Sequence, residues 1–134
     1  MLKVKHKLLY MDLASRIAQE SYAKRLKVGC VIVKNDNVIS MGWNGTPPGW
    51  DNDCEEDGKT RPEVFHSEEN AILKLSRDGG GANGATMFVT HAPCINCARM
   101  IFKAGIDIVH YKEEYRDDAG IKFLKKTGVA VGKY

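Results

Sequence analysis

The order of apolar segments constrains the fold of this chain more than any other feature. Two runs of β-forming residues, Val28–Val33 and Val38–Trp43, flank the segment Lys34–Asn37, whose Asn and Asp residues tolerate the positive φ of a tight hairpin. After this hairpin, helical and strand-like patterns alternate to the end of the sequence. Such an order predicts a mixed sheet, because right-handed crossovers between its parallel strands place helices on both faces. We therefore expect an α/β fold with about five strands in one central sheet.

Hydrophobic periodicity and helix-end signals give the expected boundaries. An amphipathic helix starts near Lys7, and its apolar face includes Leu9, Leu13 and Ile17. The later expected elements are a helix at His66–Leu75, a strand at Ala85–Thr90, a helix at Cys94–Ala104, a strand at Ile106–Tyr111, a helix capped by Asp117 or Asp118, and a strand at Val129–Val131. Between the hairpin and the second helix, the segment Asn44–Glu63 shows neither the hydrophobic periodicity of a helix nor that of a strand. This predicts a long loop.

Composition limits the classes of function. The chain has 134 residues, 43% hydrophobic and 28% charged, which is typical of one globular domain, and we treat residues 1–134 as that domain. The net charge of +3 is too small to indicate a nucleic-acid-binding protein. The apolar runs are too short for a membrane span or a signal peptide, so we expect a cytoplasmic protein without a membrane partner. Of the cysteines, Cys30 is expected to be a buried apolar residue and Cys54 a free thiol.

The other two cysteines form a pattern typical of metal or redox chemistry. Cys94 and Cys97 lie about one turn apart at the start of a predicted helix, so both thiolates project from one face and can share an ion. His66 opens another predicted helix, and three protein ligands leave one position open for water, as in catalytic zinc sites. Glu68 then suits a general acid–base. The alternative, a structural zinc site or an unmetallated cysteine pair beside an exposed histidine, is disfavoured because a closed site needs a fourth ligand.

Two longer motifs connect these residues to a known family. His66-Ser67-Glu68 together with Pro93-Cys94-Ile95-Asn96-Cys97 matches the signature of the zinc nucleobase deaminases. The segments Gly42–Pro47, Glu69–Ile72 and Gly84–Thr90 make the chain resemble deoxycytidylate (dCMP) deaminases, particularly the compact, phage-like members. The aromatic-Asn-Gly step and the Glu-Asn-Ala-Ile continuation distinguish it from tRNA adenosine deaminases and free cytidine deaminases. The resemblance implies the cytidine-deaminase-like fold, a three-layer α/β/α sandwich around a mixed sheet.

The resemblance also implies a reaction. His66, Cys94 and Cys97 would hold one catalytic Zn²⁺, and a zinc-activated hydroxide would attack C4 of dCMP to give dUMP and ammonia. Glu68 would act as the proton shuttle, by accepting the water proton, protonating cytosine N3 and delivering a proton to the departing amine. The product would feed thymidylate synthesis.

The expected substrate contacts surround this centre. Asn44 would hydrogen-bond the deoxyribose, the backbone of Ser67 would meet the pyrimidine carbonyl, and Tyr115 would lie near the 5′-phosphate. Arg25 is the preferred cationic phosphate ligand, although a solvated helix C-terminus explains it equally well. Position 67 is usually Ala in the family. His91 is an unusual residue beside the site, where it is either a loop residue near the substrate or a second metal ligand.

Regulation and assembly are implied by the resemblance alone. Many family members are homohexamers activated by dCTP with Mg²⁺ and inhibited by dTTP, so we expect a homo-oligomer, with a hexamer favoured, in the host cytoplasm if the source is a virus. Gly45 and Thr46, or the turn Gly79–Gly84, would offer backbone N–H groups to the effector. The alternative function is a base-editing or tRNA adenosine or cytidine deaminase. An aromatic content of 8% and the small net charge weigh against a nucleic-acid partner.

Overall fold

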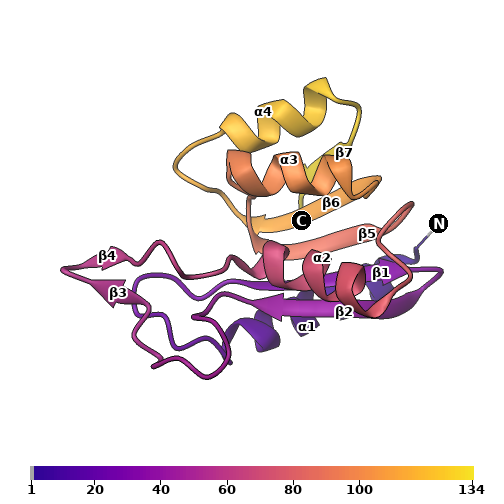
Figure 1. The fold of residues 1–134 in the computed structure, drawn as a ribbon. Coiled ribbons are helices and arrows are strands. Elements are labelled where there is room, and N and C mark those ends of the chain that lie inside the picture. The colour runs from indigo at the N-terminus through magenta and orange to yellow at the C-terminus, as the bar shows by residue number, and fades with distance from the viewer. Residues whose placement is uncertain (1) are drawn as a thin grey trace.

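The computed structural model describes residues 2–134 as a mixed sheet between two helical layers (Figure 1). In chain order the elements are α1 (Val4–Ala18), β1 (Gly29–Lys34), β2 (Asn37–Trp43), β3 (Glu55–Glu56), β4 (Lys59–Thr60), α2 (Ser67–Asp78), β5 (Thr86–His91), α3 (Ile95–Lys103), β6 (Ile108–Glu113), α4 (Ala119–Lys126) and β7 (Ala130–Lys133). The central sheet has five strands in the order β2-β1-β5-β6-β7. The expected α/β class and three-layer α/β/α arrangement are confirmed.

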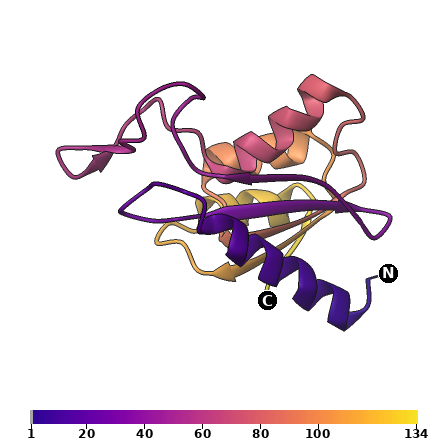
Figure 2. The same ribbon diagram turned by 90° about the horizontal axis from the view of Figure 1, so that it is seen from below.

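Strand direction in the sheet changes at β5. Strand β1 pairs antiparallel with both β2 and β5, whereas β5, β6 and β7 run parallel. The parallel strands require crossover helices, and α3 and α4 supply them on the face that α2 also covers, while α1 covers the opposite face (Figures 1 and 2). The parallel half of the sheet therefore has its carboxyl ends, and the loops that follow them, at one edge.

The sheet has a buried cluster on each face because successive strand residues point to opposite sides. On β1, Val31 and Val33 pack toward α1 with Phe88 of β5, while Cys30 and Ile32 belong to the larger cluster beneath α2 and α3. The prediction that Cys30 is a buried apolar residue is confirmed, since its side chain is fully buried.

The buried face of α1 differs from the expected one. Ala14, Ile17 and Ala18 of the expected face are buried, as predicted. Leu9 is 56% exposed, so its prediction as a core residue is wrong, and Tyr10 and Met11 are buried in its place. The reason is a contact that the helical pattern does not contain. The Tyr10 hydroxyl donates hydrogen bonds to the carboxylate and the carbonyl oxygen of Asp36 in the β1–β2 turn. This contact holds the Tyr10 side chain against the β1–β2 turn.

The expected loop at Asn44–Glu63 contains a short hairpin, β3–β4, which projects from the body (Figure 1). Glu55 pairs with Thr60 and Glu56 pairs with Lys59. The turn residues Asp57 and Gly58 both have positive φ, which these residue types tolerate. Two-residue strands are too short to produce an alternating pattern, so the sequence predicts the long loop but not the short hairpin inside it.

Helix α1 contacts β1 backbone to backbone at Gly29. A Cβ atom at this position would overlap the carbonyl oxygen of Ala14 and would lie 2.6 Å from the backbone nitrogen of Ala18. Any larger residue must therefore push α1 away from the sheet.

We predict that Gly29→Ala lowers the free energy of unfolding by about 1–3 kcal/mol, the usual cost of inserting atoms into a well-packed core. Urea unfolding followed by circular dichroism measures the change. Gly132→Ala is the matched control, because a Cβ at Gly132 on β7 meets nothing within 4 Å. Equal unfolding midpoints for the two variants would contradict the close packing described for Gly29.

Candidate active site

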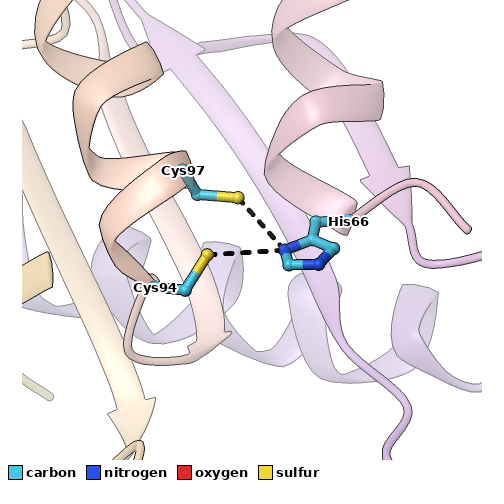
Figure 3. Close-up of side chains that lie close together, drawn as sticks. All are labelled: His66, Cys94 and Cys97. Carbon is cyan, nitrogen blue, oxygen red and sulfur yellow. Dashed lines mark hydrogen bonds between the residues drawn. The ribbon is translucent and has the colours of Figure 1, made fainter. Parts of the chain in front are cut away.

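Three side chains with metal-binding atoms converge where α2 and α3 begin (Figure 3). His66 is the N-cap residue of α2, Cys94 is the N-cap residue of α3, and Cys97 lies in the first turn of α3. His66 Nδ1 is 3.6 Å from the Sγ of Cys94 and 3.3 Å from the Sγ of Cys97. In a tetrahedral zinc site with ordinary bond lengths, nitrogen and sulfur ligands lie about 3.5 Å apart. The predicted ligands are therefore brought together at a spacing that fits Zn²⁺.

Within residues 2–134, no other group of three His, Cys, Asp or Glu side chains has this spacing. His91 and Cys54 lie outside it, so the reading of His91 as a second metal ligand gains no support. Cys54 is free, as predicted, and is also buried beside Ala23 and Val64.

Hydrogen bonds among His66, Cys94 and Cys97 shift the pKa values of all three side chains. A hydrogen bond from Cys97, assisted by His66, lowers the pKa of Cys94 to about 4. The same hydrogen bond, together with burial, raises the pKa of Cys97 above its usual range, and the Cys94 thiolate raises the pKa of His66 to about 9. At pH 7 the metal-free trio therefore has one thiolate, one thiol and one imidazolium. Because metal ligands must be deprotonated, an incoming ion displaces the remaining protons.

We predict that Zn²⁺ binding at pH 7 releases about two protons per ion, one from His66 and one from Cys97, and that the affinity falls as the pH is lowered. Isothermal titration calorimetry in buffers of different ionisation enthalpy measures the number released. Cys54→Ala should behave like the wild type, whereas Cys97→Ala should lose tight binding. Binding without proton release would show that the ligand set is not the one described.

Glu68 lies buried directly after the first metal ligand. Its side chain exposes 4% of its surface, and Ser67, which is fully buried, donates a hydrogen bond from Oγ to Glu68 Oε1 at 2.7 Å. Burial raises the pKa of Glu68, and the Ser67 hydroxyl partly opposes this shift by stabilising the carboxylate. A carboxyl group whose pKa is displaced toward neutrality is suited to both accepting and donating a proton.

A cavity of about 880 Å³ is lined by His66, Cys94, Ser67 and Glu68. Its walls come from the end of α1, the segment before β1, the start of α2, and the loops that follow β5 and β6. All of the substrate-binding residues predicted from the sequence line it, and these are Arg25, Asn44, Ser67 and Tyr115. Lys112, Glu113 and Glu114 also line it; the sequence reading assigned them no role because only the parallel pairing of β5 and β6 brings them there.

Asn44 has a structural role that the sequence reading missed. Its Oδ1 accepts a hydrogen bond from the Val28 N–H at 2.9 Å, and its Nδ2 donates one to the Leu26 carbonyl at 2.8 Å. These bonds hold the segment before β1 against the end of β2. An amide side chain can make further hydrogen bonds, so one N–H and one acceptor site are left for a ligand.

The segment carrying Arg25 is fixed from the other side by the projecting hairpin. The carboxylate of Glu55 accepts hydrogen bonds from the backbone N–H groups of Lys24 at 3.1 Å and Arg25 at 3.2 Å. The guanidinium of Arg25 is exposed on the cavity wall. No local pattern could have identified Glu55, because its partners lie far away in the sequence.

At the expected effector-binding residues Gly45 and Thr46, hydrogen-bond donors are already paired within the protein. The Gly45 N–H donates to the Phe65 carbonyl, and the Thr46 hydroxyl donates to the Asp51 carbonyl. At the glycine-rich turn, the Gly84 N–H donates to the Gly105 carbonyl. These bonds give the predicted effector contacts at Gly45 and Thr46 no support.

No helix within residues 2–134 is both long and apolar enough to cross a membrane.

Fold and site together define a class of protein: a three-layer α/β/α domain with a His–Cys–Cys group that fits a metal ion at two helix N-termini and a buried glutamate in the same cavity. The family model described as the cytidine and deoxycytidylate deaminase zinc-binding region matches residues 4–113, and the chain belongs to this family.

Individual relatives agree with this assignment. The chain is 38% identical to the deoxycytidylate deaminase of Saccharomyces cerevisiae over 93% of its own length, but it spans only 43% of that protein. It is 33% identical to the deoxycytidylate deaminase of Enterobacteria phage T4, covering 78% of this chain and 76% of that one. The crystal structure of dCMP deaminase from the cyanophage S-TIM5 in complex with dCMP and dUMP superposes with a TM-score of 0.97 at 43% identity, covering 100% of both chains. The resemblance to phage-like dCMP deaminases is confirmed.

Proposed function

We propose that this protein is a dCMP deaminase that hydrolyses dCMP to dUMP and ammonia. The observation that carries the proposal is one cavity lined by His66, Cys94, the buried Glu68 and an exposed cationic rim, with Cys97 within metal-binding distance of His66 and Cys94. The similarity to a structure solved with dCMP and dUMP supports it.

The chain's residues have distinct tasks in this proposal. His66, Cys94 and Cys97 would hold Zn²⁺, which supplies a water molecule that ionises near neutral pH. Glu68 would accept one proton from the water and pass it to N3 of the pyrimidine. It would then accept a second proton from the hydroxyl group added at C4 and pass it to the departing amine. Because the Ser67 hydroxyl occupies Oε1, the second carboxylate oxygen is left to carry the proton. Burial keeps the carboxyl group away from bulk water, which supports this shuttle.

The remaining contacts would recognise the rest of the nucleotide. A 5′-phosphate carries up to two negative charges, and the exposed side chains of Arg25, Lys27 and Arg116 on the cavity wall supply cations for it, with Tyr115 beside them. The unused amide donor of Asn44 would bind the deoxyribose, and the backbone at Ser67 would bind the pyrimidine carbonyl.

The same wall favours a mononucleotide over a polynucleotide. Glu113 and Glu114 are exposed and line the cavity together with the cationic side chains. The wall that residues 2–134 form thus has mixed charge and lacks the continuous basic groove with stacking aromatic residues that is typical of polynucleotide-binding proteins. We therefore do not favour a base-editing or tRNA deaminase.

Regulation and assembly complete the proposal. Activation by dCTP with Mg²⁺, inhibition by dTTP, a hexameric assembly, a cytoplasmic location and a role in thymidylate synthesis are supported by the family resemblance. The assembly has one structural support as well, since α3 leaves Ile95 at 36% and Phe102 at 41% exposure.

The direct test compares dCMP, CMP, deoxycytidine and dCTP, each with and without Mg²⁺-dCTP, by ammonia release and loss of the cytosine chromophore. We predict that kcat/KM for deoxycytidine is at least about 100-fold lower than for dCMP, because hydrogen bonds between charged groups contribute about 1.5–3 kcal/mol each. Equal efficiency with deoxycytidine or CMP would refute the phosphate or deoxyribose part of the proposal.

Glu68→Gln is the control for mechanism in that assay. The variant should fold and bind Zn²⁺ normally while kcat falls by at least about 100-fold, the usual contribution of a general acid–base. Glu56→Gln, at an exposed position on β3, should retain full activity. If Glu68→Gln loses its metal and its fold, Glu68 has a structural role instead.

A further inference from the structure

His91 is a titratable residue of the cavity wall that the proposed chemistry does not use. It is the last residue of β5, it is half-buried, and its ring lines the cavity that contains Glu68 and Cys94. Its Nδ1 lies 3.1 Å from the hydroxyl oxygen of Thr90. One ring nitrogen is therefore held by the protein, and Nε2 remains for a ligand.

The Thr90 hydroxyl is itself held in place. Its oxygen accepts a hydrogen bond from the Gly29 N–H at 3.1 Å, and Thr90 exposes only 5% of its surface. Gly29 is packed directly against α1, so that a Cβ atom there would overlap the backbone of Ala14 and Ala18. The sheet thus fixes the position of the atom that contacts His91.

This arrangement decides where the imidazole proton lies. Along residues 2–134, the contacts of the Thr90 hydroxyl are the Gly29 N–H, which donates to it, and His91 Nδ1. If Nδ1 carried a proton, it would also donate to this oxygen, and the buried hydroxyl proton would lack an acceptor, at a cost of about 1–3 kcal/mol. The hydroxyl therefore donates to Nδ1, and the imidazole proton is on Nε2. Burial also lowers the pKa of His91, against an opposing effect of Glu113, so the ring is neutral at pH 7.

We propose that His91 is a specificity residue, positioned by Thr90, which presents its neutral Nε2–H donor to an oxygen acceptor of the nucleotide. The proposal rests on the proposed function for the identity of the ligand. The shared chemistry is an oxygen that accepts a hydrogen bond, from either the pyrimidine nucleoside or its phosphate, and the experiment distinguishes the two.

The proton position is tested without substrate. In ¹⁵N-histidine-labelled, Zn²⁺-loaded protein at pH 7, the NMR signature of His91 should show a protonated Nε2 and an unprotonated Nδ1. Thr90→Ser keeps the hydroxyl and should keep this pattern, whereas Thr90→Val should lose the preference. A protonated Nδ1 in the wild type would overturn the proposal, even if Thr90→Val does not fold.

The ligand contact is tested by calorimetric binding of dUMP and deoxyuridine to the Zn²⁺-loaded protein. His91→Leu, which removes the donor, should weaken dUMP binding about five- to tenfold, whereas His91→Gln, which retains an N–H donor, should bind more tightly than His91→Leu. An effect on dUMP alone assigns the acceptor to the phosphate, and an equal effect on deoxyuridine assigns it to the nucleoside.

Wild-type affinity for both ligands in His91→Leu would overturn the contact. Failure of the proposed function would be distinguishable, because the wild type would then bind neither ligand.

Discussion

The meeting of two helix N-termini is the contact on which the rest of this structure depends. His66 at the start of α2 and Cys94 at the start of α3 lie far apart in the chain, yet the atoms that would bind a metal are within 4.8 Å of each other. Each side chain lies at a helix end where unpaired backbone N–H groups favour negative charge, which stabilises a thiolate. The residues that follow His66 are buried in the first turn of α2. The ligand set and the carboxyl group of Glu68 are therefore positioned by the same helix end.

Packing on the opposite face of the sheet also affects the cavity. Helix α1 lies so close to β1 that Gly29 has no space for a side chain. The backbone of Gly29 in turn holds Thr90, and Thr90 holds His91 at the cavity wall. A chain of contacts thus runs from a helix on one face, through the sheet, to a polar side chain at the cavity wall.

Sequence reasoning recovered the features that local patterns encode. The order of elements follows from periodicity and from glycine and proline positions. The motifs also predict the grouping of His66, Cys94 and Cys97, whose metal-binding atoms the structure brings within 4.8 Å of one another. The features that the sequence did not predict depend on hydrogen bonds between segments that are far apart in the chain. The hydrophobic pattern predicts a buried Leu9, because it gives no information on the hydrogen bond between Tyr10 and Asp36.

The role of Glu55 and the structural bonds of Asn44 were missed for the same reason. Their partners are backbone groups in the segment before β1, and backbone groups leave no trace in residue types. Only the folded arrangement shows that two residues of the Asn44–Glu63 region hold the segment that carries Arg25.

The central claim, that one Zn²⁺ is held by His66, Cys94 and Cys97 beside Glu68, is tested most directly by anomalous diffraction at the zinc edge from crystals grown with Zn²⁺ and dUMP. The account predicts one strong peak, about 2.0–2.1 Å from His66 Nδ1 and about 2.3 Å from each Sγ, with its fourth position open toward Glu68. A peak at another site, or a fourth protein ligand that closes the coordination shell, would contradict it.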